Sequence, residues 1–142
     1  MRASGLGDSA ERVRQVRLQA AERVIEVARE QRVECMILAG DTFEDNSVDP
    51  VLAQKVADIL DRAPCPVFIL PGNHDPLTAG SVYDREMWKR TRKVTVWREP
   101  VPMELREGVV LYPCPSLTRR REDPTAWIPA RTAGDESIRI GI

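Results

Sequence analysis

Two short apolar runs, each followed by a glycine and polar residues, limit most strongly what this chain can fold into. The first run covers residues 35–39 and the second covers residues 67–70. Short uncharged runs of this kind are typical of strands buried on both faces of a sheet. Between them, Asp49 followed by Pro50 predicts a helix start, because an N-cap carboxylate precedes a proline at the first helical position. The order strand, helix, strand predicts two parallel neighbours in an α/β fold.

Periodicity predicts the remaining elements. Apolar residues recur at three- and four-residue steps over residues 9–32, which indicates an amphipathic helix capped by Asp8 or Ser9. We expect the strand at residues 35–39 to be central in its sheet. The full expectation is helices over residues 9–32, 50–62 and 81–89, strands over residues 35–39, 67–70, 93–97, 102–105, 109–112 and 138–142, and a loop over residues 118–135.

Length, composition and charge limit the classes of protein to which this chain can belong. With 142 residues, 42% of them hydrophobic, the chain fits a single domain covering residues 1–142. Its 21 Lys and Arg against 22 Asp and Glu give a net charge of -1, so no global attraction to nucleic acid or anionic membrane is expected. No apolar run approaches the roughly 20 residues of a membrane helix. These features predict a cytoplasmic protein without a membrane partner, whose three separated cysteines stay reduced.

Polar residues follow each apolar run where the predicted strand ends. Because parallel strands end at the same sheet edge, where ligands collect in open α/β folds, we expect Asp41 and Asn73 to meet there. Asp41 offers an anionic oxygen that can bridge two hard cations, and Asn73 offers a neutral carbonyl oxygen. His74 adds an imidazole, a side chain that can act as a proton donor or acceptor, and we expect Asp75 to orient it.

These residue types suit a phosphoesterase that uses two metal ions. Such an enzyme holds its ions roughly 4 Å apart, where they activate water and neutralise the phosphate during an in-line displacement. His74 would protonate the leaving oxygen or stabilise the charge that develops on phosphorus. A plain turn is the alternative, because Gly, Asn and Asp are favoured turn residues. The run of four residues 72–75 favours a functional site over a plain turn. It directly follows one predicted apolar strand, and the other predicted apolar strand is followed by Gly-Asp.

Both motifs resemble those of a known superfamily. The chain contains Leu38-Ala39-Gly40-Asp41-Thr42-Phe43 and Val67-Phe68-Ile69-Leu70-Pro71-Gly72-Asn73-His74-Asp75. These runs resemble the second and third motifs of calcineurin-like metallophosphoesterases, and within that superfamily the DNA-repair exonuclease branch typified by bacterial SbcD. The resemblance covers most of residues 10–115. It implies a four-layer α/β/β/α sandwich with mixed sheets.

The resemblance also implies roles and partners. Asp41 matches the carboxylate that bridges both metals, Asn73 matches a ligand of the second metal, and His74 matches the residue that engages the scissile phosphate. The implied cofactors are two divalent ions, of which manganese is the expected one. DNA is the implied substrate, and an SbcC-like ATPase subunit and a homodimer are the implied assemblies.

The chain departs from the family pattern in one respect. That pattern opens with a strand ending in Asp-x-His and closes with two further His-containing motifs, whereas His74 is the single histidine among the 142 residues. We therefore expect an incomplete sandwich that lacks the first strand, in a chain truncated at both ends. Asp41 and Asn73 alone give too few ligands for two ions, so the isolated chain should be inactive or nearly so. An unpaired apolar strand would also invite strand exchange.

Two other functions stay open. The same motifs serve phosphoesterases that act on nucleotides or small diesters, and the basic run at residues 119–121, which could favour DNA, is more readily a solvated loop than a DNA contact. The missing ligands also suit a degenerate, non-catalytic phosphoesterase-like domain that binds a partner. The primary expectation is a metal-dependent phosphodiester hydrolase, a DNA-repair exonuclease when complete.

Overall fold

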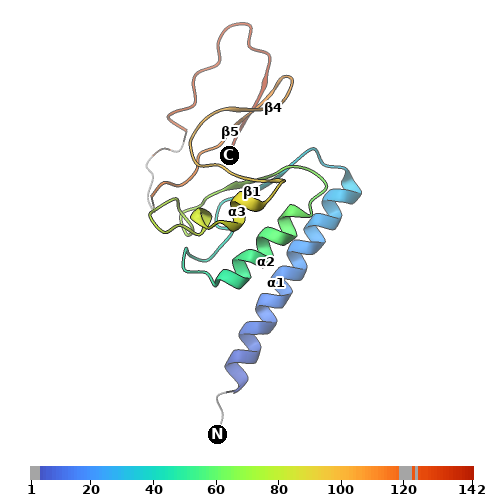
Figure 1. Ribbon diagram of the computed structural model, residues 1–142. Helices are drawn as coiled ribbons and strands as arrows, with labels where there is room; N and C mark the ends of the chain where they lie inside the picture. The colour runs from blue at the N-terminus through green and yellow to red at the C-terminus, as the bar shows by residue number, and fades with distance from the viewer. Residues whose placement is uncertain (1–3, 119–122, 124) are drawn as a thin grey trace.

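The computed structural model describes residues 4–118, 123 and 125–142, and it alternates helices with short strands (Figure 1). Its elements in chain order are α1 (Ser4–Gln31), β1 (Met36–Ala39), α2 (Pro50–Asp61), β2 (Val67–Leu70), the 3-10 turn η1 (Val82–Asp84), α3 (Met87–Arg90), β3 (Val94–Val96), β4 (Met103–Arg106), β5 (Val109–Tyr112) and β6 (Ile138–Gly141).

The first sheet is entirely parallel, with strand order β1-β2-β3. Ile37 of β1 lies opposite Phe68 of β2, which lies opposite Thr95 of β3. The predicted parallel pairing across α2 is therefore confirmed. The prediction that residues 35–39 form a central strand is wrong within the described residues, where β1 lies at the sheet edge and β2 is central. An apolar run does not report whether both edges of a strand are paired, and β1 is accordingly only half-buried, whereas β2 is buried throughout.

The second sheet is mixed, with strand order β4-β5-β6. β4 and β5 form the predicted antiparallel hairpin, whose turn contains Gly108 at a φ of 74°, a conformation that glycine adopts at little cost. β6 pairs with β5 in parallel, from Val109 opposite Ile138 to Tyr112 opposite Gly141. The final strand at residues 138–142 is therefore confirmed as well.

The layers stack as helices, first sheet and second sheet (Figure 1). One core lies between the helices and the first sheet, and contains Ile25, Ala53, Ile59, Val67, Ile69, Tyr83 and Trp88 among others. A second core lies between the sheets, where Phe68 stacks on Trp97 with ring centroids 5.0 Å apart and Leu111 is fully buried. The expected α/β sandwich with mixed sheets is confirmed. In the described part of the chain, three of the four expected layers are present.

Helix boundaries differ from the sequence expectation in two places. α1 begins at Ser4, so Asp8 and Ser9 lie inside the helix rather than at its start, where the sequence placed them. The helix expected over residues 81–89 is divided into η1 and α3, because Arg85 between them is extended, with φ -69° and ψ 142°. No helix in the described residues is both long and apolar enough to cross a membrane.

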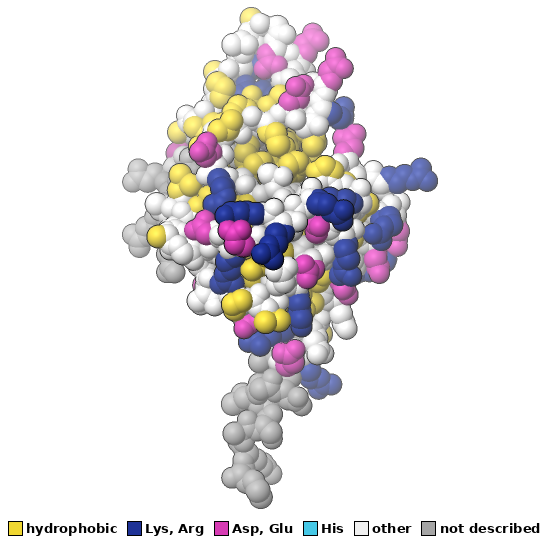
Figure 2. All heavy atoms as spheres, in the orientation of Figure 1, with side chains coloured by type: hydrophobic (Ala, Val, Ile, Leu, Met, Phe, Trp, Pro, Cys, Tyr) yellow, Lys and Arg dark blue, Asp and Glu magenta, His cyan; other side chains and the backbone are white. Residues whose placement is uncertain are grey.

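On the face shown in Figure 2, apolar and charged side chains gather in different regions. Apolar side chains gather over the second sheet and over the junction of the two sheets. Over the helices, Lys and Arg side chains alternate with Asp and Glu side chains, as expected for a solvated surface. Ion pairs such as Arg23 with Glu26 and Arg62 with Glu22 contribute to this pattern.

Candidate functional site

The candidate site lies where β1 and β2 end. Ala39 pairs with Leu70 at the last position of the two strands, so the loops that follow leave the sheet side by side. The backbone N–H of His74 donates to Oδ1 of Asp41 over 3.0 Å, which joins the two loops directly. The structure thus brings together the two motifs that the sequence placed at one sheet edge. The side chains of Asp41, Asn73 and His74 are all exposed.

Glycines allow this close approach. A β-carbon built on Gly72 would lie 2.2 Å from Oδ1 of Asp41, and one built on Gly40 would lie 3.5 Å from the α-carbon of Gly72. Gly40 also has a φ of 87°, which disfavours any other residue. Space therefore excludes a side chain at Gly72, whereas Gly40 is required by its backbone conformation.

Asp41 itself has a left-handed backbone, with a φ of 50°. Among residues other than glycine, Asp and Asn adopt this conformation at the lowest cost. Non-glycine residues in this region cost about 1 kcal/mol or more and cluster at functional sites. The unusual turn directs the Asp41 carboxylate toward the backbone of His74, where it accepts the hydrogen bond described above.

The His74 imidazole is held through one nitrogen. Its Nδ1 lies 3.2 Å from the backbone oxygen of Glu44. Because a carbonyl oxygen can only accept a hydrogen bond, this contact assigns the proton of the neutral ring to Nδ1. Nε2 is then the nitrogen left for a substrate. Asn73 and His74 line a shallow, open hollow together with Glu44 and Asp45.

Asp75 is fully buried and binds other groups than the imidazole. Its Oδ1 accepts from the Gly72 N–H over 2.7 Å, and its Oδ2 accepts from the Phe43 N–H over 3.0 Å and from the Tyr83 hydroxyl over 2.6 Å. The expected contact with the His74 ring is thus replaced by the Glu44 carbonyl. Asp75 instead ties the loop after β2 to the loop after β1.

The Tyr83 hydroxyl is a constant hydrogen-bond donor to Asp75 because it stays protonated. Burial, reinforced by the hydrogen bond to Asp75, raises the pKa of Tyr83 far above its ordinary value. The hydroxyl therefore keeps its proton under all ordinary conditions. Asp75 accepts three hydrogen bonds in a site without solvent access, which satisfies a group that would otherwise be costly to bury.

Comparison with known families identifies this arrangement. The family model described as calcineurin-like phosphoesterase matches residues 6–119, a range that includes both motif loops and the helices and strands that carry them. The chain belongs to the calcineurin-like phosphoesterase family. This family consists of metal-dependent phosphoester hydrolases, so the chain is assigned to that class of hydrolase. None of the curated proteins compared with the chain matches it significantly.

The residues at the site meet part of the family's need for divalent metal ions. Asp41 and Asn73 present oxygen donors, which hard divalent cations prefer. Within the described residues, however, no group of three or more His, Cys, Asp or Glu side chains is arranged to hold a metal ion. The donor types therefore fit a shared ligand and one further ligand of a calcineurin-like phosphoesterase site, and they do not amount to a complete two-ion site.

Three residues that shape the site were not predicted from the sequence. Glu44 holds the imidazole through its carbonyl, Asn46 joins the loop after β1 to Pro76 in the loop after β2, and Tyr83 donates to Asp75 in that second loop. Every residue has a backbone carbonyl, so residue type could not identify Glu44 as the residue that holds the imidazole. Asn46 lies in a polar stretch that indicated only a turn, and Tyr83 lies where an ordinary helix was expected.

Proposed function

We propose that this chain is the catalytic part of a metal-dependent phosphodiester hydrolase. The observation that carries the proposal is the 3.0 Å hydrogen bond from the backbone N–H of His74 to the Asp41 carboxylate, which places an exposed carboxylate against the backbone of the residue that carries an exposed imidazole. Asp41 and Asn73 would hold divalent ions, with manganese as the proposed metal. When bound, these ions supply an activated water and neutralise charge on the phosphate.

His74 is proposed to act on the phosphate through Nε2. Since the Glu44 carbonyl accepts from Nδ1, Nε2 carries a proton only when the ring is an imidazolium. The imidazolium would donate that proton to the leaving oxygen, or donate a hydrogen bond to a phosphoryl oxygen. The ring needs a fixed orientation for either role, and its contact with the Glu44 carbonyl supports one.

The proposed substrate is DNA, digested from its ends. The hollow lined by Asn73 and His74 is open to solvent, and this supports a polymeric substrate that would extend beyond it. The interleaved charges over the helices in Figure 2 offer no broad basic surface on that face. The basic run at residues 119–121 lies outside the described residues. Nucleotides and small diesters remain the second substrate class to compare.

A non-catalytic binding domain is the second candidate. The observation that favours it is the lack of three clustered ligand side chains in the described part of the chain. Calorimetric titration with Mn2+ separates the two candidates. Binding that is lost in Asp41→Asn supports the hydrolase, whereas no heat of binding up to about millimolar metal supports the binding domain.

The test of the hydrolase is manganese-dependent cleavage of a chromogenic phosphodiester and of linear duplex DNA. Because few ligands are present, we expect weak activity that requires high manganese and disappears with a chelator. His74→Ala should lower the rate by about 100-fold or to background, as for loss of a general acid. Lys55→Ala, on the exposed side of α2, is the matched control. Cleavage that persists unchanged in His74→Ala would contradict the proposal.

A further inference from the structure

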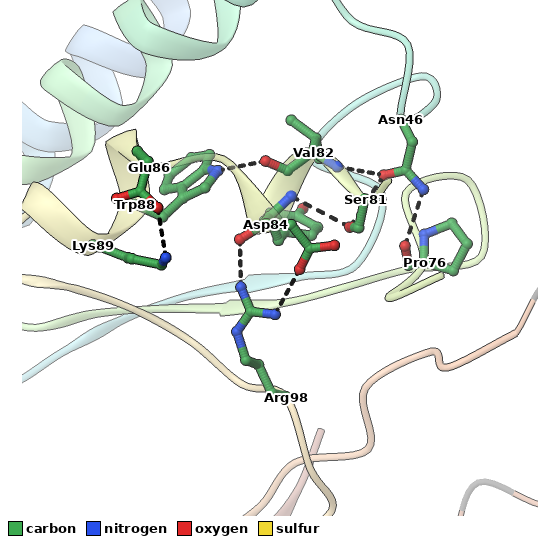
Figure 3. Close-up of polar contacts among 10 residues, drawn as sticks. Asn46, Pro76, Ser81, Val82, Asp84, Glu86, Trp88, Lys89 and Arg98 are labelled. Carbon is green, nitrogen blue, oxygen red and sulfur yellow. Dashed lines mark hydrogen bonds and ion pairs between the residues drawn. The ribbon is translucent and has the colours of Figure 1, made fainter. Parts of the chain in front are cut away.

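The 3-10 turn η1 contacts both loops of the candidate site from their buried side. Figure 3 shows Asn46 and Arg98 reaching η1 from different directions. η1 follows the loop that carries Asn73 and His74, and it is buried at Val82 and Tyr83. η1 lies beneath both of the loops that carry Asp41 and His74. The side chains of these two residues are exposed, so burial does not fix the spacing between them.

Asn46 forms the first connection. It lies on the loop after β1, and its side-chain Nδ2 donates to the Pro76 carbonyl over 3.0 Å. Its Oδ1 accepts from the Val82 N–H over 2.9 Å and from the Ser81 hydroxyl over 3.3 Å. One carboxamide thus satisfies groups at both ends of the segment from the second motif to η1 (Figure 3). An apolar side chain supplies neither the donor nor the acceptor, and an ionised aspartate supplies acceptors only.

Tyr83 forms the second connection. Its hydroxyl donates to Oδ2 of Asp75, and the same oxygen accepts from the Phe43 N–H, two residues beyond Asp41. Phe43 also packs on Tyr83, with ring centroids 6.1 Å apart. The η1 turn therefore holds the loop of Asp41 through two routes, one through Asn46 and one through Asp75.

The turn is itself fixed to the core. Arg98, just beyond β3, donates to the Tyr83 carbonyl and lies 2.9 Å from the Asp84 carboxylate. The indole N–H of the buried Trp88 donates to the Val82 carbonyl over 3.0 Å. Because η1 is bonded to the segment after β3 and to α3, a loop bonded to η1 is held against the rigid part of the fold. Precise sites generally need such support beneath their reacting groups.

We propose that Asn46 and Tyr83 are positioning residues that act through η1 to set the separation and orientation of Asp41 and His74. The inference rests on the proposed function of that pair. Neither residue is placed in contact with substrate or metal. Their role is to keep the Asp41 carboxylate and the His74 backbone within hydrogen-bond distance, and with them the Glu44 carbonyl beside the imidazole.

The first test measures geometry in the metal-free chain. Amide hydrogen exchange at His74 and Phe43 reports the two cross-loop hydrogen bonds, and ring nitrogen chemical shifts report the tautomer of His74. In Asn46→Ala and in Tyr83→Phe we expect both amides to exchange at least about tenfold faster and the ring to populate both tautomers, because the loops open locally. Gln54→Ala, which removes an exposed carboxamide bonded to Asp58 on α2, should change neither.

A purely structural role predicts a different outcome. It would lower the free energy of unfolding and speed all core amides alike, without a selective change at His74 and Phe43 or in the ring signals. That pattern, or unchanged signals, would overturn the proposal. If Asn46→Ala does not fold, Asn46→Asp serves in its place. It keeps the acceptor for Val82 and Ser81 and loses the Nδ2 donor to the Pro76 carbonyl and the Thr78 hydroxyl.

The second test uses Mn2+ alone as the probe. Paramagnetic broadening of the Asp41, Asn73 and His74 signals in the unaltered chain reports metal binding at the proposed site. We expect Asn46→Ala and Tyr83→Phe to need about tenfold more Mn2+ for equal broadening, a loss typical of groups that orient ligands. Broadening equal to that of the unaltered chain would count against positioning. Absence of broadening in the unaltered chain would instead contradict the proposed function, while the exchange data still judge positioning.

Discussion

The α-carbon of Gly72 lies against Asp41 so closely that a β-carbon at position 72 would come 2.2 Å from the carboxylate Oδ1 and 2.3 Å from the backbone nitrogen. The two loops therefore have no room for even a methyl group between them. This contact positions the Asp41 carboxylate over the turn that leads to His74, and it makes the glycine as necessary to the site as the ligands.

Gly72→Ala should destabilise the chain by about 3 kcal/mol, a large value for overpacking, because the obstacle includes backbone that cannot rotate away. Urea unfolding followed by circular dichroism measures the change. Gly141→Ala is the matched control, since its new β-carbon would meet only Ile128 at 3.8 Å, an ordinary contact. Similar losses for the two variants would mean that the loops do not pack as described.

The sequence predicted the strands and the meeting of the motifs because those depend on local signals. β2 matches its predicted bounds because Pro66 and Pro71 delimit an uninterrupted apolar run. The meeting of Asp41 and His74 follows from parallel pairing, which the strand, helix, strand order requires. These features need no knowledge of distant contacts.

Other features depend on partners that the sequence does not reveal. The edge position of β1 follows from which strands are present, and it cannot be read from four apolar residues. Asp75 was expected to orient His74, yet in the interior it accepts instead from the Tyr83 hydroxyl and the Phe43 N–H. Such contacts appear only after the loops are folded over η1.

Asp41→Asn should weaken metal binding while leaving the stability of the fold almost unchanged. Asparagine adopts the left-handed backbone as readily as aspartate, and its Oδ1 still accepts from the His74 N–H. We therefore expect the free energy of unfolding to change by less than about 0.5 kcal/mol. Loss of the anionic oxygen should weaken Mn2+ binding by about tenfold or more. Calorimetry measures the binding, with Asp58→Asn on α2 as the control that should leave it unchanged.

Asp49→Ala should weaken the start of α2. Oδ1 of Asp49 accepts from the Leu52 N–H over 3.0 Å, and Pro50 occupies the first helical position. Without the cap, one backbone donor loses its partner, and we expect a loss of about 1 kcal/mol in urea unfolding. Asp49→Asn retains the acceptor and should recover most of this stability. If the alanine variant is as stable as the unaltered chain, solvent satisfies the Leu52 N–H equally well.

The buried phenol of Tyr83 should make stability fall at high pH. Burial raises the pKa of Tyr83 in the folded chain, whereas the phenol of the unfolded chain ionises near its ordinary value of about 10. The stabilisation that the protonated phenol contributes is therefore complete below about pH 10. Above that pH it falls by about 1.4 kcal/mol per pH unit. Urea unfolding of the unaltered chain and of Tyr83→Phe, between about pH 8 and pH 11, isolates this contribution. The difference between the two should stay constant up to about pH 9.5 and then shrink. Parallel curves over the whole range would show that the phenol ionises as easily in the folded chain, and hence that it is not held against Asp75.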